Sequence, residues 1–237
     1  NNYWKSTEFS DDEWISLLNH CKKNKIHFIS SPFSLFAAKF LNKIGMKIWK
    51  IASGEINNFE MLDFIRNTKK PIILSTGMSF LNETKKAFNF LMEKNRNVSV
   101  LQCTSIYPSG PKDIGLNVML DLYNKFNCTF GLSDHSGEIF PSLAATTLGA
   151  KIIEVHVTIS KEYFGPDTAS SLDIEQLSQL LKGIKFINEM QNNPVNKDLK
   201  SRSLSNMKKM FEKSLVAKRS LLKGHRLKRT DISLKKP

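Results

Sequence analysis

Short hydrophobic runs alternate with amphipathic stretches along most of the chain. Six apolar, β-rich runs recur, at residues 26–30, 48–52, 71–75, 98–104, 129–133 and 151–157. Such runs are typical of buried strands. The segments between them carry helix-start chemistry, because Ser10 is followed three residues later by Glu13, and Asn82 or Glu83 opens a stretch that runs to about Lys94. The alternation predicts a parallel sheet with helices outside it.

A doubly wound sheet and a TIM barrel both satisfy this alternation. No predicted strand is followed by a GxGxxG fingerprint, which favours the barrel. A closed barrel of this type has eight strands, whereas the pattern shows six. The chain also opens on Asn1 and Asn2 without an initiator Met. We therefore expect an α/β fold, a TIM-type (β/α)8 barrel that lacks its first two βα units.

The pattern changes after the last predicted strand. A helix is expected at residues 174–190, followed by the polar stretch 191–200, where the composition shifts. We expect the barrel at residues 1–193, a linker at 194–212 and the start of a second unit at 213–237. That last segment is too short to bury a core of its own.

Composition narrows the class of protein. The chain has 237 residues, 41% of them hydrophobic, which suffices for one large core. It contains no run of about 18 apolar residues, and its start lacks the layout of a signal peptide, so we expect a cytoplasmic protein without membrane contact. The three cysteines are odd in number and lack CxxC spacing, which favours reduced thiols over a disulfide framework or a structural zinc site.

The formal charge of +13 is concentrated at the end of the chain. Residues 194–237 contain fourteen Lys or Arg and three Asp or Glu, which leaves only +2 for the preceding residues. Phe211 is the one aromatic residue of this segment, and no zinc or RNA-binding signature accompanies it. We therefore expect a solvated basic surface and no nucleic-acid partner, with a nucleic-acid site here as a further hypothesis.

Polar residues gather at the predicted carboxyl ends of the strands, which face the active site of a TIM barrel. In chain order they are Ser31; Lys50, Ser53 and Glu55; Ser75; Ser105 and Tyr107; Ser133 and His135; and Glu154 and His156. Hydroxyl groups and a lysine supply the donors that a small anion needs, such as a phosphorylated keto acid. This rim predicts a phosphate or carboxylate site.

Two histidines of this rim could share a metal ion. His135 and His156 end consecutive predicted strands, hence lie about 5 Å apart across the sheet. Two imidazoles leave open coordination positions for water and a substrate carbonyl, and Mn²⁺ or Mg²⁺ is the expected ion. Singly, each could equally be a structural histidine, which is the interpretation we keep for His20, His27 and His225, since no polar partner of matching position is evident.

Two acidic residues keep two interpretations each. Glu55 is either catalytic or a carboxylate stabilised at a helix N-terminus. Asp167, in a GPD sequence after the last predicted strand, could be a turn residue.

Six motifs follow one another at the predicted strand ends. They read KIASGE (residues 50–55), STGM (75–78), CTSIYPS (103–109), GLSDHSG (131–137), IIEVHVT (152–158) and GPD (165–167). In order and spacing the chain closely resembles the sialic acid synthase family, which includes neuraminic, legionaminic and pseudaminic acid synthases. Six motifs in sequence are far more specific than one. The resemblance implies a TIM barrel, a following antifreeze-like (SAF) domain and a domain-swapped homodimer.

The resemblance also implies roles for individual residues. Phosphoenolpyruvate would be held by Ser31, Lys50, Ser53, Ser75, Ser105 and Ser133. His135 and His156 would bind the metal, Glu55 would lie beside the aldehyde of the open-chain N-acylated amino sugar, and Asp167 would bind sugar hydroxyls. The enol carbon of phosphoenolpyruvate would attack the metal-polarised aldehyde, water would capture the resulting cation, and phosphate would leave by C–O cleavage.

The chain departs from the family at three positions. The family usually has Lys or Arg at the position of Val155, often His at Thr168 and frequently Asn at Gly115. None of these changes removes a predicted metal ligand. Because the first two βα units and the end of the antifreeze-like domain have no counterpart, an inactive fragment or pseudoenzyme that acts as an interaction module is the alternative hypothesis.

Overall fold

The computed structural model describes residue 5 and residues 7–236. They form two compact units, which divide between Asn188 and Glu189. No helix in the described part of the chain is long and apolar enough to cross a membrane.

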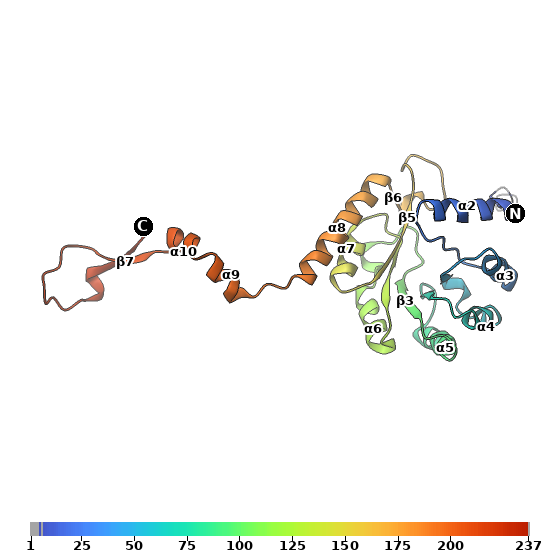
Figure 1. Ribbon diagram of the computed structural model, residues 1–237, viewed down its shortest axis with the longest axis horizontal. Helices are drawn as coiled ribbons and strands as arrows, with labels where there is room; N and C mark the ends of the chain where they lie inside the picture. The colour runs from blue at the N-terminus through green and yellow to red at the C-terminus, as the bar shows by residue number, and fades with distance from the viewer. Residues whose placement is uncertain (1–4, 6, 237) are drawn as a thin grey trace. The chain divides into compact units, whose positions relative to one another are not determined.

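The first unit is built on one parallel sheet of six strands. They pair in chain order: β1 (Trp49–Ile51), β2 (Ile72–Ser75), β3 (Val98–Cys103), β4 (Phe130–Asp134), β5 (Ile152–Val157) and β6 (Ser171–Leu172). Figure 1 shows helices in an arc along the outside of this sheet: α3 (Leu35–Lys43), α4 (Phe59–Asn67), α5 (Leu81–Met92), α6 (Leu116–Phe126), α7 (Phe140–Thr147) and α8 (Ile174–Asn192). The predicted α/β architecture is confirmed.

The sheet is strongly curled into a half-barrel. Three strands separate β1 from β5 in the sheet, a distance of roughly 19 Å if it were flat. Lys50 on β1 nevertheless lies within 3.2 Å of Glu154 on β5. Curling therefore brings distant strands together on the concave side.

The core lies between the convex side of the sheet and the helices. On β1, Trp49 and Ile51 are fully buried against this layer, and the intervening Lys50 points to the concave side. Trp49 Nε1 also donates a hydrogen bond to Thr68 Oγ1 at 2.8 Å. Because side chains alternate along a strand, the same alternation that buries the core presents polar residues to the concave face.

Five of the six predicted strands are confirmed to within one residue at each end. The prediction of a strand at residues 26–30 is wrong. This segment has no regular secondary structure and pairs with no strand of the sheet, and the Ser30 N–H donates to Met46 Sδ at 3.3 Å. Ile26 and Ile29 are exposed, and of the apolar residues of this run only Phe28 packs against the core. The sixth strand is instead β6, whose two residues are too few to show a periodicity.

The predicted helix starts are confirmed. In α2 (Asp11–Lys23), Ser10 Oγ accepts from the Glu13 N–H, and Glu13 Oε2 accepts from the Ser10 N–H at 2.7 Å. The helix expected near Asn82 begins at Leu81, where Glu83 accepts from the Phe80 N–H at 2.8 Å. In both helices a side chain satisfies a backbone donor that the first turn leaves free.

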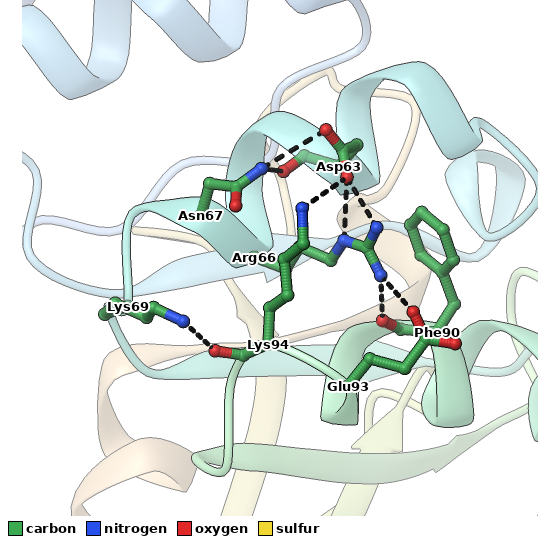
Figure 2. Close-up of polar contacts among 7 residues, drawn as sticks. All are labelled: Asp63, Arg66, Asn67, Lys69, Phe90, Glu93 and Lys94. Carbon is green, nitrogen blue, oxygen red and sulfur yellow. Dashed lines mark hydrogen bonds and ion pairs between the residues drawn. The ribbon is translucent and has the colours of Figure 1, made fainter.

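A buried arginine joins two outer helices. Arg66 on α4 donates to Asp63 Oδ1, to the Phe90 carbonyl and to Glu93 Oε2 at 2.7–2.8 Å (Figure 2). Its guanidinium also lies 3.5 Å from the centroid of the Phe90 ring, which allows a cation–π interaction. These contacts connect α4 to α5 and use most of the hydrogen-bonding capacity of Arg66.

The second unit contains two short helices and a hairpin. They are α9 (Lys197–Ser203), α10 (Ser205–Phe211) and the antiparallel strands β7 (Ser214–Ala217) and β8 (Ile232–Lys235). Both helices fall within the range 194–212 that was expected to be a linker.

Asp231, at the end of η4 (Arg229–Asp231), organises the hairpin. Its buried carboxylate accepts from Arg219 at 2.9 Å, from His225 Nε2 at 2.8 Å and from the Lys228 N–H at 3.0 Å. The expectation that His225 lacks a polar partner is therefore wrong. Its partner could not be found from the sequence because the turn of the hairpin brings the two residues together.

Candidate functional site

The concave face of the half-barrel carries several of the polar residues predicted at the strand ends. Lys50 on β1 pairs in register with Ile73 on β2, and Ser133 on β4 pairs with Glu154 on β5. Residues in register in a parallel sheet point to the same side. The structure thus gathers these side chains on one surface, at the end of the sheet where active sites of α/β barrels lie.

Glu154 is the centre of this group. Its Oε1 atom accepts a hydrogen bond from Ser133 Oγ at 2.6 Å and lies 3.2 Å from Lys50 Nζ. A cavity of about 360 Å³ opens beside this contact. Its lining consists of Ile29, Ser31, Lys50, Ile73, Glu154, Val155 and His156. Ser31, Lys50 and His156 therefore face the same space, as the rim prediction requires.

Three side chains converge on the backbone at Gly77. Ser53 Oγ accepts from the Gly77 N–H at 2.9 Å, and the Gly77 carbonyl accepts from the Ser105 N–H. A Cβ at position 77 would meet Cys103 Sγ at 2.6 Å and would also clash with the Ser53 and Ser105 hydroxyls. Glycine is needed here because the loops after β1, β2 and β3 approach too closely for any side chain.

Ser75, at the end of β2, is buried but unsatisfied. It is 1% exposed, and its Oγ atom has no hydrogen-bond partner among the described residues. A buried hydroxyl without a partner costs free energy and is characteristic of a position that meets a ligand or a water molecule. Ser75 is therefore suited to a role in binding.

The two histidines of the rim lie next to each other. The ring centroids of His135 and His156 are 5.1 Å apart. His135 Nδ1 lies 3.1 Å from the Thr104 carbonyl oxygen, which can only accept, so this contact places the proton on Nδ1 and leaves the Nε2 lone pair free. The Asp167 carboxylate lies 3.6 Å from His156 Nδ1 and favours the same tautomer there.

The local environment keeps His156 neutral. Burial, and after it the proximity of His135, lowers the pKa of His156 below its ordinary value. A neutral imidazole is the form that binds metal ions. Near neutral pH His156 therefore presents a lone pair.

The donor set fits a divalent ion. Two imidazoles that share one ion at N–metal distances of about 2.1 Å have ring centroids roughly 5 Å apart, close to the observed spacing. Within the described part of the chain, no cluster of three His, Cys, Asp or Glu has metal-binding geometry. An ion held by His135 and His156 would thus keep open positions for oxygen ligands.

Tyr107 covers the histidine pair. Its ring centroid lies 4.3 Å from that of His135 and 5.8 Å from that of His156. Burial raises the pKa of the Tyr107 hydroxyl, which keeps it protonated and able to donate a hydrogen bond. Tyr107 and Asp167, which were predicted to bind substrate, both lie beside the histidines.

Glu55, one of the predicted site residues, is held by a contact within its own loop. It ends η1 (Ser53–Glu55), and its Oε2 atom accepts a hydrogen bond from Asn58 Nδ2 at 2.8 Å. Glu55 is thus tied to Asn58, the residue that caps α4.

Glu154 lies at a predicted strand end, but its residue type and position alone predict no role for it. Its spacing of two from His156 places both side chains on one face of β5, which was the available signal. Its partner Lys50 could not be found in the same way, because the ion pair depends on the curl of the sheet.

The model of the NeuB family matches residues 1–196. The chain belongs to the NeuB family. This NeuB-family chain is 39% identical to the N,N'-diacetyllegionaminic acid synthase of Campylobacter jejuni, over 93% of the chain and 66% of that protein. It is 34% identical to the pseudaminic acid synthase of Helicobacter pylori (95% and 66%) and 31% identical to human N-acetylneuraminate-9-phosphate synthase (92% and 60%). The predicted resemblance to the sialic acid synthases is confirmed.

Solved structures agree with this membership. The N-acetylneuraminic acid synthetase of Leptospira borgpetersenii, crystallised with citrate, superposes with a TM-score of 0.79 at 29% identity, covering 85% of this chain and 72% of that one. A 3-deoxy-D-arabino-heptulosonate 7-phosphate synthase from Thermotoga maritima, at 15% identity and a TM-score of 0.65, shares the fold. The NeuB-family chain spans 60–66% of the length of the three curated relatives named above.

Proposed function

We propose that this chain carries the phosphoenolpyruvate and metal site of an enzyme that condenses phosphoenolpyruvate with an N-acylated amino sugar. The products would be a nonulosonic, sialic-type acid and phosphate. Membership of the NeuB family and the names of the similar synthases support this assignment.

The observation that carries the proposal is the convergence of anion-binding groups on the concave face. Lys50 supplies a positive charge, Ser133 a hydroxyl and Ser75 a buried hydroxyl whose hydrogen bond is not used within the described residues. Ser31 reaches the same cavity. Together they match a ligand with carboxylate and phosphate oxygens, the two anionic groups of phosphoenolpyruvate.

The histidine pair provides the second element of the proposal. His135 and His156 would hold a divalent ion such as Mn²⁺, which when bound supplies Lewis acidity for a carbonyl oxygen. The Thr104 carbonyl and Asp167 orient the two imidazoles, and Tyr107 shields them from one side. These contacts preorganise the site, which lowers the cost of reaching the transition state.

The acceptor sugar would lie beyond the histidines, toward the loops. Tyr107 and Asp167 could hydrogen-bond sugar hydroxyls from there, and Glu55 would position or transfer a proton near the aldehyde. We propose N-acetylmannosamine or a related N-acylated amino sugar as the acceptor class, in a homodimeric enzyme.

The test is release of phosphate from phosphoenolpyruvate in the presence of Mn²⁺ and N-acetylmannosamine or related amino sugars. It should be made with this chain and with a form extended at both ends to the length of its relatives. We expect release that requires both metal and sugar and that His135→Ala abolishes.

The control is His20→Ala, because His20 is exposed on α2 and is not among the residues that line the cavity. This variant should keep full activity. If the extended, folded form binds phosphoenolpyruvate but releases no phosphate with any amino sugar, the proposed reaction is refuted. The hypothesis of an inactive interaction module is then favoured.

A further inference from the structure

The ion pair between Lys50 and Glu154 occupies the groups that an anionic ligand would need. Ser133 Oγ and Lys50 Nζ approach the same oxygen, Oε1 of Glu154, at 2.6 Å and 3.2 Å. They come from β4 and β1, so a single carboxylate oxygen bridges the curl of the sheet. In its position and charge this oxygen resembles one from a bound carboxylate or phosphate.

Glu154 and an incoming anion compete for the same hydrogen-bond donors. A serine hydroxyl has one hydrogen, and Ser133 gives it to Glu154. The same hydroxyl therefore has none to give an anion until its bond to Glu154 breaks. Lys50 has three donors, but one is directed at Glu154, whose negative charge also repels an arriving anion at short range.

The carboxylate is not locked in place. Its side chain is 39% exposed, compared with 12% for Lys50, and it lines the cavity of about 360 Å³. Glu154 can therefore turn towards solvent and keep its own charge hydrated, whereas the charge of Lys50 stays within the site and needs a new partner, which an anion would supply.

We propose that Glu154 is a positioning residue that holds Lys50 and Ser133 in the ligand-free protein and transfers them to the anionic substrate when it binds. This inference rests on the proposed function, because it takes phosphoenolpyruvate as the anion. Without a ligand, the carboxylate balances the charge of Lys50 and keeps its side chain directed into the cavity. The cost is a lower affinity for the substrate.

The experiment is calorimetric titration of the chain with phosphoenolpyruvate in metal-free buffer, which separates this step from the histidine pair. Glu154→Gln keeps the size of the side chain but removes the charge that competes for Lys50. We expect its Kd to fall about fivefold relative to the unmodified protein. Glu154→Asp retains the charge and should return the Kd to within about twofold of the original value.

The matched control is Glu162→Gln, which makes the same charge change in the loop after β5, where Glu162 is exposed. It should leave the Kd unchanged, so that a general effect of net charge is excluded. A merely structural role of Glu154 predicts the opposite sign, with weaker binding and a lower Tm for Glu154→Gln.

The outcomes separate the two proposals. If the unmodified protein binds phosphoenolpyruvate and Glu154→Gln binds it equally or more weakly, the transfer is refuted and the substrate assignment stands. If the protein and both Glu154 variants fail to bind phosphoenolpyruvate at millimolar concentration, the proposed function is overturned, and the transfer with it.

Discussion

Two cations of the half-barrel, Arg66 and Lys50, are paired in different ways. Arg66 lies between α4 and α5, where two carboxylates, a carbonyl and an aromatic ring satisfy it (Figure 2). Lys50 lies on the concave face, where its ion pair is with Glu154, a residue it shares with Ser133. The unsatisfied Ser75 hydroxyl lies on the same face. A saturated network stabilises a fold, whereas groups with unused or exchangeable bonds are available to a ligand.

Removing the guanidinium of Arg66 should have the largest effect on stability. Arg66→Ala loses three hydrogen bonds and the contact with Phe90, and we expect about 2–3 kcal/mol of destabilisation by chemical denaturation. The two carboxylates are partly exposed, so they can be hydrated again, which limits the loss. Arg96→Ala, on an exposed arginine nearby, should change stability by less than about 0.5 kcal/mol. An equal loss of stability in both variants would show that the contacts of Arg66 make no specific contribution to the fold.

Replacing Lys50 should show the opposite pattern. Lys50→Met keeps the length of the side chain but loses the charge, and we expect affinity for phosphoenolpyruvate to fall about tenfold, or about 1.4 kcal/mol. Stability should change by less than about 1 kcal/mol, since the ion pair is partly exposed. Calorimetric titration and thermal unfolding measure the two quantities. Lys39→Met, on the exposed side of α3, serves as the charge control. If Lys50→Met lost stability but kept its affinity for phosphoenolpyruvate, Lys50 would be a structural residue like Arg66.

The smallest expected effect is confined to the hairpin of the second unit. Hydrogen bonds from His225, and after it from Arg219, hold the pKa of the Asp231 carboxyl far below its usual range. A lowered pKa means that the ionised form stabilises the fold, so its contribution is present above pH of about 4 and is lost as the pH falls further.

Asp231→Asn should therefore reduce amide hydrogen-exchange protection in β7 and β8 at pH 7, and the unmodified hairpin should keep its protection down to pH of about 4. Asp198→Asn, an exposed change in α9, should leave the hairpin protected. Protection that is independent of Asp231 would show that the hairpin relies on other contacts.

The sequence determined the local structure and the residue types of the site. Periodicity identified five strands, and the pairing of Ser10 with Glu13 marked a helix start, because both depend on neighbours in the chain. The polar residues at the strand ends followed from the alternation of side chains, since in a parallel sheet all these ends meet at one edge.

Tertiary structure decided which of these residues act together. Residues 26–30 have the composition of a strand but pair with no strand of the sheet, because pairing requires a partner that composition does not specify. The contact between Lys50 and Glu154 arises from the curl of the sheet, and the contact between His225 and Asp231 from the turn of the hairpin. A periodic pattern indicates which face of a strand or helix a side chain occupies. The distance between two residues that are far apart in the sequence is set by how the whole chain packs.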